Sequence, residues 1–140
     1  MTIVIGYKES DTSRAALDHG LALAERLSMP VVVINAGPGA EHRAESQLTR
    51  AETEQLEQYL AKAPVAAEFR QYSRGRSTAD EFKDVVAELH PYMVVIGAAR
   101  RSGFSKFMMG SVADELLREL PVPVLSVKVP EESVVTSAKE

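Results

Sequence analysis

One stretch of the chain combines residue types that together could bind an anion. It runs from an apolar segment, Met93–Gly97, through a loop rich in glycine, serine, arginine and lysine to Gly110 and Ser111. Ser111 and Asp114 form a capping-box pattern, which predicts that a helix starts there. The free N–H groups of a first helical turn and the helix dipole favour negative charge, and loop cations strengthen that preference. The stretch therefore predicts a site that binds a small phosphate-bearing ligand.

Each of these residues also has a purely structural interpretation. Gly97, Gly110 and Ser111 would cradle phosphate, or they would only end a strand and cap a helix. Arg100 would place its guanidinium on a phosphate, or it would lie in solvent with the rest of the basic loop. Lys8, just after the first apolar run, would reach the same phosphates or be an ordinary surface lysine. The residues alone leave these alternatives open.

Residues that commonly perform catalysis are not grouped along the chain. There is no cysteine, which excludes disulfides, thiolate metal sites and cysteine nucleophiles. The three histidines are scattered, with no second histidine or carboxylate at ligand spacing, so no metal site is predicted. Neither a P-loop, nor a Gly-x-Gly-x-x-Gly fingerprint after the first apolar run, nor a Gly-x-Ser-x-Gly elbow is present. We predict a protein that is not an enzyme.

Composition narrows the class of protein further. A chain of 140 residues is expected to fold as one domain. Its formal net charge of −4 argues against nucleic acid and anionic membranes as general partners. No apolar run approaches the roughly 20 residues that a membrane span requires. The segment Met1–Ile5 lacks the features of a signal peptide, so a cytoplasmic location is expected.

Apolar runs alternate with amphipathic helical patterns along the chain. The runs predict strands at Ile3–Tyr7, Pro30–Ala36, Ala66–Ser73, Met93–Gly97 and Val122–Val129. The helical patterns between them lie at Ser13–Leu27, Glu41–Ala63, Ser77–Leu89 and Ser111–Leu120. Only the third run alternates apolar and polar residues, which predicts an edge strand. Residues 130–140 carry no periodic signal, so we expect a domain over 1–129 and a disordered tail over 130–140.

Alternating strands and helices predict an α/β fold with a parallel sheet covered on both faces. In such sheets, ligands bind beyond the carboxyl ends of the strands, where the strand order reverses. The turns after the first and fourth strands would line that crevice. Lys8, Gly97 and the Gly110–Ser111 pair are therefore expected to come together. The last apolar run, at an edge, needs protection that a second copy of the chain would supply.

Taken in order, these features resemble the universal stress protein family. Its nucleotide-binding members carry Gly-x2-Gly-x9-Gly-Ser/Thr after the fourth strand, and Gly97, Arg100, Gly110 and Ser111 stand at those positions. The closing segment Pro121–Val127 and the opening run also fit. The resemblance implies an open twisted five-stranded parallel sheet of order 3-2-1-4-5, Rossmann-like and similar to the adenine nucleotide alpha-hydrolases. It also implies binding of ATP or AMP, with magnesium left open, and a homodimer formed through the fifth strand.

Two residues depart from the family pattern. Lys8 stands where the family usually has an acidic residue, and lysine cannot accept hydrogen bonds as a carboxylate does. Arg100 replaces the second glycine, so it would either fork onto a phosphate or fill the pocket. With these departures, the resemblance implies nucleotide-binding residues Gly6, Lys8, Ile34, Ile96, Gly97, Arg100, Gly110, Ser111 and Val112. It implies a dimer interface made by Val124, Leu125, Ser126 and Val127.

The sequence thus supports two functions. The first is a stress-response or regulatory protein that binds an adenine nucleotide without catalysis. The alternative is a dimeric protein-interaction module of the same fold that has lost nucleotide binding. In that case Arg100 and Lys8 would occupy the crevice, and a protein partner that the sequence does not identify would bind elsewhere.

Overall fold

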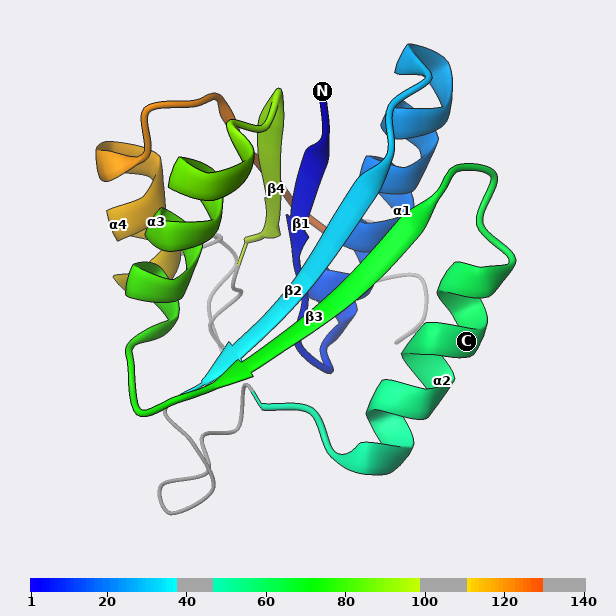
Figure 1. The fold of residues 1–140 in the computed structure, drawn as a ribbon, viewed down its shortest axis with the longest axis horizontal. Helices are drawn as coiled ribbons and strands as arrows, with labels where there is room; N and C mark the ends of the chain where they lie inside the picture. The colour runs from blue at the N-terminus through cyan, green and yellow to red at the C-terminus, as the bar shows by residue number, and fades with distance from the viewer. Residues whose placement is uncertain (38–46, 99–110, 130–140) are drawn as a thin grey trace, which may run out of the picture.

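The computed structural model describes residues 1–37, 47–98 and 111–129 (Figure 1). Strands and helices alternate along these residues, as the hydrophobic periodicity predicts. The strands are β1 (Ile3–Gly6), β2 (Val31–Gly37), β3 (Ala67–Ser73), β4 (Met93–Gly97) and β5 (Val124–Val127). The helices are α1 (Asp11–Leu27), α2 (Arg50–Ala61), α3 (Thr78–Leu89) and α4 (Ser111–Glu119).

The five strands form one sheet of order β3-β2-β1-β4-β5, and all neighbouring pairs are parallel. This confirms the predicted α/β fold and strand order. The chain first adds strands on one side of β1 and then returns to add β4 and β5 on the other side. The strand order therefore reverses between β1 and β4, whose carboxyl ends lie next to each other.

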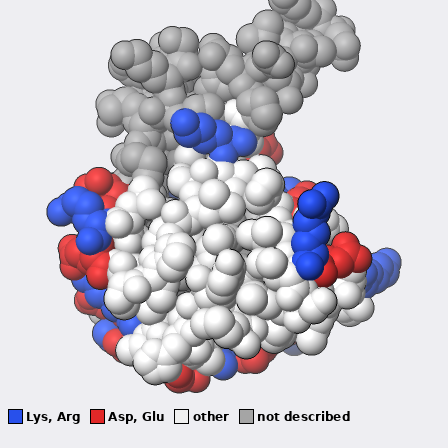
Figure 2. Space-filling view, turned by 90° about the horizontal axis from the view of Figure 1, so that it is seen from above, with Lys and Arg blue, Asp and Glu red and all other residues white. Residues whose placement is uncertain are grey.

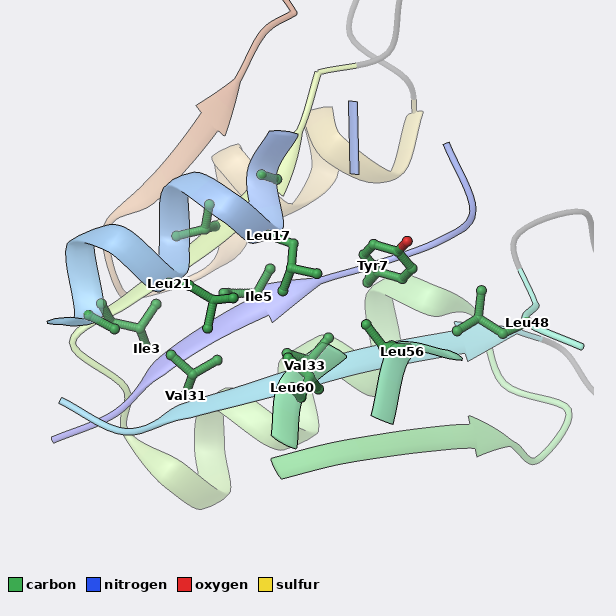
Figure 3. Close-up of a cluster of buried hydrophobic side chains, with 13 residues drawn as sticks. Ile3, Ile5, Tyr7, Leu17, Leu21, Val31, Val33, Leu48, Leu56 and Leu60 are labelled. Carbon is green, nitrogen blue, oxygen red and sulfur yellow. The ribbon is translucent and has the colours of Figure 1, made fainter. Parts of the chain in front are cut away.

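Helices cover both faces of the sheet, which explains why its central strands are apolar without alternation. Ile3 and Ile5 of β1 point to the face covered by α1 and α2, where Leu17 and Leu56 are also buried (Figure 3). Val4 points to the other face, where Phe82 of α3 and Leu116 of α4 complete a second cluster. Each fully buried side chain of this size contributes about 1.5–3 kcal/mol to folding.

The amino ends of the helices are set by capping residues. The side chain of Ser10 accepts a hydrogen bond from Ser13 N–H at the start of α1, and Ser77 accepts one from Asp80 N–H at the start of α3. The cap at Ser77 confirms the prediction made from the sequence. Helix α4 also begins at Ser111 as predicted, although the side chain of Ser111 lies outside the described part of the structure.

The predicted helix over Glu41–Ala63 is wrong at its amino end. Helix α2 begins only at Arg50, because Thr49 has extended backbone and forms a full capping box with Glu52. Leu48, which fits a helical apolar stripe, is buried in the core from a non-helical segment instead. Residues 38–46 of this prediction lie outside the described residues.

Other boundaries differ by a few residues. Strand β5 covers Val124–Val127 rather than the predicted Val122–Val129. At its amino end, Pro123 has no N–H to continue the ladder. The predicted tail, residues 130–140, lies outside the described residues. Across 1–37, 47–98 and 111–129, no helix is long and apolar enough to cross a membrane.

Candidate functional site

The end of β4 lies tightly against the first turn of α1. A Cβ atom added at Gly97 would lie 2.5 Å from the carbonyl oxygen of Thr12 and 2.9 Å from the nitrogen of Ser13. Only glycine allows two backbones to approach this closely without displacement. Gly97 therefore has a packing role in this structure, and it brings the β4 exit beside the turn that follows β1.

The turn after β1 is held by hydrogen bonds that leave the Lys8 side chain exposed. Lys8 N–H donates to Ser13 Oγ at 3.1 Å, and Ser13 N–H donates to Ser10 Oγ at 3.2 Å. The Lys8 side chain is exposed, and no ion-pair partner of its ammonium lies among the described residues. Asp11 places a carboxylate in the same helical turn. Lys8 and Asp11 thus place opposite charges near the start of α1.

A buried amide network closes the end of β2, and sequence reasoning missed it. Asn35 is 1% exposed, its Nδ2 donates to the carbonyl oxygen of Tyr7 at 2.9 Å, and its Oδ1 accepts from Leu48 N–H at 2.9 Å. Gln71 Nε2 donates to the same Oδ1 at 3.0 Å and to the carbonyl oxygen of Leu48 at 3.1 Å. The one signal in the sequence is an asparagine that interrupts the apolar run Val31–Ala36.

Tyr7 ends β1 with a buried ring. Its hydroxyl donates to Glu9 Oε2 at 3.5 Å, and burial is the main cause that raises the pKa of Tyr7 above the ordinary value of 10.0. Because the pKa of Tyr7 is higher in the folded state than in the unfolded chain, neutral Tyr7 stabilises the fold. This contribution is fully present at pH values below the pKa of Tyr7 in the unfolded chain. That contribution is lost as the pH rises through the folded pKa.

We therefore expect wild-type protein to lose more stability between pH 9 and about pH 12 than the Tyr7→Phe variant. Urea unfolding at several pH values in this window measures the difference. Identical slopes of stability against pH for the two proteins would show that Tyr7 does not cause this loss.

The remaining predicted binding residues divide into three groups. The first group, Gly6, Ile34 and Ile96, lies at or near the carboxyl ends of adjacent strands. A Cβ at Gly6 would meet the Phe82 ring at 2.7 Å. Both isoleucine side chains are buried in the core. Val112, in the first turn of α4, is 39% exposed. Arg100, Gly110 and the side chain of Ser111 lie outside the described residues. In the part of the chain that is described, no cluster of histidine and carboxylate side chains is arranged to hold a metal ion.

The surface at the amino ends of the strands is mostly uncharged. Figure 2 views the molecule from the end at which β2 and β3 begin, and the Lys, Arg, Asp and Glu side chains lie mainly at the margins of a broad uncharged area. Exposed Met1 and Tyr92, at the starts of β1 and β4, are residues of this end.

Within the described residues, β5, which contains the predicted dimer residues, is an edge strand of the sheet. Val94 N–H donates to the carbonyl oxygen of Pro123 at 2.9 Å, and Ala98 N–H donates to that of Val127 at 2.8 Å. Backbone groups of successive strand residues point to opposite sides. Those of Val124 and Ser126 therefore point away from β4 to the free edge.

Comparison with known proteins identifies the family. A family model described as the universal stress protein family matches residues 1–128. The chain belongs to the universal stress protein family. A universal stress protein of Mycolicibacterium smegmatis is 34% identical over 126 residues, which cover 90% of this chain and 96% of that protein.

Solved structures of family members have the same fold. The universal stress protein of Archaeoglobus fulgidus superposes with a TM-score of 0.76 at 28% identity, covering 91% of this chain and 98% of that one. A universal stress protein from Archaeoglobus fulgidus in complex with dAMP gives a TM-score of 0.65 at 24% identity, with coverage of 91% and 98%. A universal stress protein in complex with cAMP gives 0.63 at 20% identity, with coverage of 91% and 96%.

Proposed function

We propose that this universal stress protein binds an adenine nucleotide, ATP or AMP, and acts in regulation or the stress response without catalysing turnover. The observation that carries the proposal is the arrangement at the carboxyl ends of β1 and β4, where the strand order reverses. There the turn that carries Lys8, whose ammonium has no ion-pair partner among the described residues, lies beside the tight β4 exit, because both contact Ser13. The family members solved with dAMP and cAMP support an adenine nucleotide as the ligand.

The proposed contacts use backbone donors and cations. N–H groups near Gly110, Ser111 and Val112 would bind phosphate, the Ser111 hydroxyl would add a bond, and Arg100 and Lys8 would neutralise charge. Backbone at Ile34 would meet the adenine ring. These groups bind and orient, so the proposal does not include hydrolysis, and magnesium is not required by any residue named here.

The packing of Gly97 is equally compatible with the alternative function. Because α1 occupies the space beside this glycine, its presence is explained without a ligand. The alternative is a protein-interaction module of the same fold in which nucleotide binding has been lost. A measurement of nucleotide affinity separates the two functions.

The role of Lys8 is testable by removing its charge. We expect Lys8→Ala to weaken ATP binding by about tenfold, the effect of losing one charge-assisted contact, and to change adenosine binding little. The matched control is Lys62→Ala, because Lys62 is an exposed lysine at the other end of the fold, where α2 ends. Isothermal titration of both ligands into the three proteins gives the result. Equal losses in the two variants, or none in either, would remove Lys8 from the site.

A cytoplasmic location remains a prediction of the sequence.

We also propose a homodimer formed through the side of β5 that points away from β4. Ser126→Pro removes an N–H that points to the free edge, so we expect a folded monomer. Leu125→Pro is the control, because Leu125 N–H points toward β4 and its loss should disrupt the fold itself. Sedimentation and circular dichroism measure both outcomes. A Ser126→Pro variant that remains a dimer would place the interface elsewhere.

A further inference from the structure

The side chain of Asn35 connects the β1 exit to the segment that leads into α2. These segments are 28 and 13 residues away from it in the sequence, yet the amide contacts both within 2.9 Å. The backbone ladder between β1 and β2 continues as far as the bond from Tyr7 N–H to the carbonyl oxygen of Ile34, at 2.9 Å. Asn35 Nδ2 then adds a bond to the Tyr7 carbonyl, one step closer to Lys8. The amide therefore extends the pairing of the two strands into the turn.

Both ends of this connection are buried. Tyr7 is 5% exposed and Leu48 is also 5% exposed. Figure 3 shows their side chains toward the arrowhead end of β1 and β2. A hydrogen bond in such surroundings is costly to break, because each group that loses its partner is left without water. Gln71 reinforces the arrangement, since its amide donates to both Asn35 Oδ1 and the carbonyl oxygen of Leu48.

We propose that Asn35 is a positioning residue for the ligand site: it fixes the Tyr7–Lys8 turn, one wall of that site, relative to the ends of β2 and β3. It acts through the backbone of Tyr7 and Leu48. The part of this inference that concerns a ligand rests on the proposed function. The positioning of the turn does not, and it can be measured in protein without ligand.

Asn35→Asp tests the contribution of the Asn35 amide donor, which bonds the Tyr7 carbonyl. The replacement keeps an oxygen for Leu48 N–H and for Gln71 but replaces the donor to the Tyr7 carbonyl with a second oxygen. The control is Thr78→Val, which removes the hydroxyl that donates to the carbonyl oxygen of Ala36 at 3.1 Å, one residue farther along β2. Both variants lose a hydrogen bond to a main-chain carbonyl at the end of the sheet, but only the first loses the bond to the β1 exit.

Amide hydrogen exchange followed by NMR is the first readout. In Asn35→Asp we expect Lys8 N–H to exchange about tenfold faster or more relative to the amides of α3, whereas Thr78→Val leaves that ratio unchanged. Unchanged exchange at Lys8 in Asn35→Asp, or an equal increase in Thr78→Val, would overturn the proposal. If Asn35→Asp does not fold, hydrogen exchange in the wild-type protein tests the proposal instead. Leu48 N–H is not in a helix or strand, but its bond to Asn35 predicts that it exchanges only through global unfolding. Exchange of Leu48 by local opening would overturn the proposal.

ATP affinity is the second readout and concerns the ligand. We expect Asn35→Asp to bind ATP about tenfold more weakly and Thr78→Val to bind within about twofold of wild type. If wild-type protein binds no ATP, the proposed function fails, while the exchange experiment still confirms or overturns the role of Asn35. Normal ATP affinity in a folded Asn35→Asp variant would show that Asn35 does not position the site.

Discussion

A methyl group added by Gly97→Ala is expected to lower the free energy of unfolding by about 3 kcal/mol. The new Cβ would lie 2.5 Å from the carbonyl oxygen of Thr12 and 2.6 Å from its carbonyl carbon, so it meets backbone that cannot rotate away. Relief requires β4 and the first turn of α1 to move apart, which disturbs the core between them. Urea unfolding followed by circular dichroism measures the loss.

Gly37→Ala is the matched control for this prediction. A Cβ at Gly37 would lie 3.3 Å from both Cβ and Oε1 of Gln47, so a shift of only a few tenths of an ångström relieves the contact. We expect this variant to lose less than about 1 kcal/mol. Equal stabilities of the two alanine variants would contradict the tight packing of Gly97 on α1.

The second large effect is expected at a buried carboxylate. Glu81 of α3 has a side chain with 0% exposure, and it accepts hydrogen bonds from Arg74 at 2.5 and 3.1 Å and from Arg76 at 3.4 Å. Replacing both arginines with alanine leaves this carboxylate without a cation among the described residues. An unpaired carboxylate at the Glu81 position is expected to cost about 3–5 kcal/mol, measured by urea unfolding at pH 7.

A third substitution distinguishes the buried charge from the loss of the arginines themselves. Adding Glu81→Leu to the double alanine variant removes the unpaired charge and should restore most of the lost stability. As a comparison, Arg50→Ala breaks the exposed pair between Arg50 and Glu54 and should change stability by less than about 0.5 kcal/mol. A triple variant no more stable than the double variant would contradict this account.

The strands and helices can be predicted from the sequence where its hydrophobic periodicity and capping residues are clear. The apolar run Met93–Gly97 coincides with β4, and the capping serine Ser77 starts α3 where it was predicted. Alternating apolar and polar residues placed β3 at an edge, which the strand order confirms. These features are local, so a single segment contains the information that determines them.

The missed features have local and long-range causes. Leu48 fits the apolar stripe of a long helix, but the capping box of Thr49 and Glu52 starts α2 after it, and its N–H donates to the distant Asn35. The stripe of α3 was defined by its apolar residues, which left out Glu81. Its burial depends on two arginines in the preceding turn, Arg74 and Arg76, and no periodicity shows that they fold back onto the helix.

The candidate ligand site is predicted less completely than the fold. Lys8 and Gly97 lie at the same edge of the sheet, as the rule for parallel sheets predicts. The contacts of Gly97 with α1 were not predicted, because close approach of two backbones cannot be recognised from a glycine in a sequence. Whether Arg100 binds phosphate or fills the crevice stays a prediction, since it lies outside the described residues.

Titration of ATP into nucleotide-stripped protein, with and without magnesium, tests the central claim most directly. The wild-type protein and an Arg100→Gly variant, which restores the family's second glycine, are measured side by side by calorimetry. We predict saturable binding by the wild type that the variant weakens, because a guanidinium contact to phosphate is lost. No binding by the wild type would contradict nucleotide binding by this chain. Recovery in the variant would then show that Arg100 fills the site, and absence of binding in both would favour the protein-interaction module.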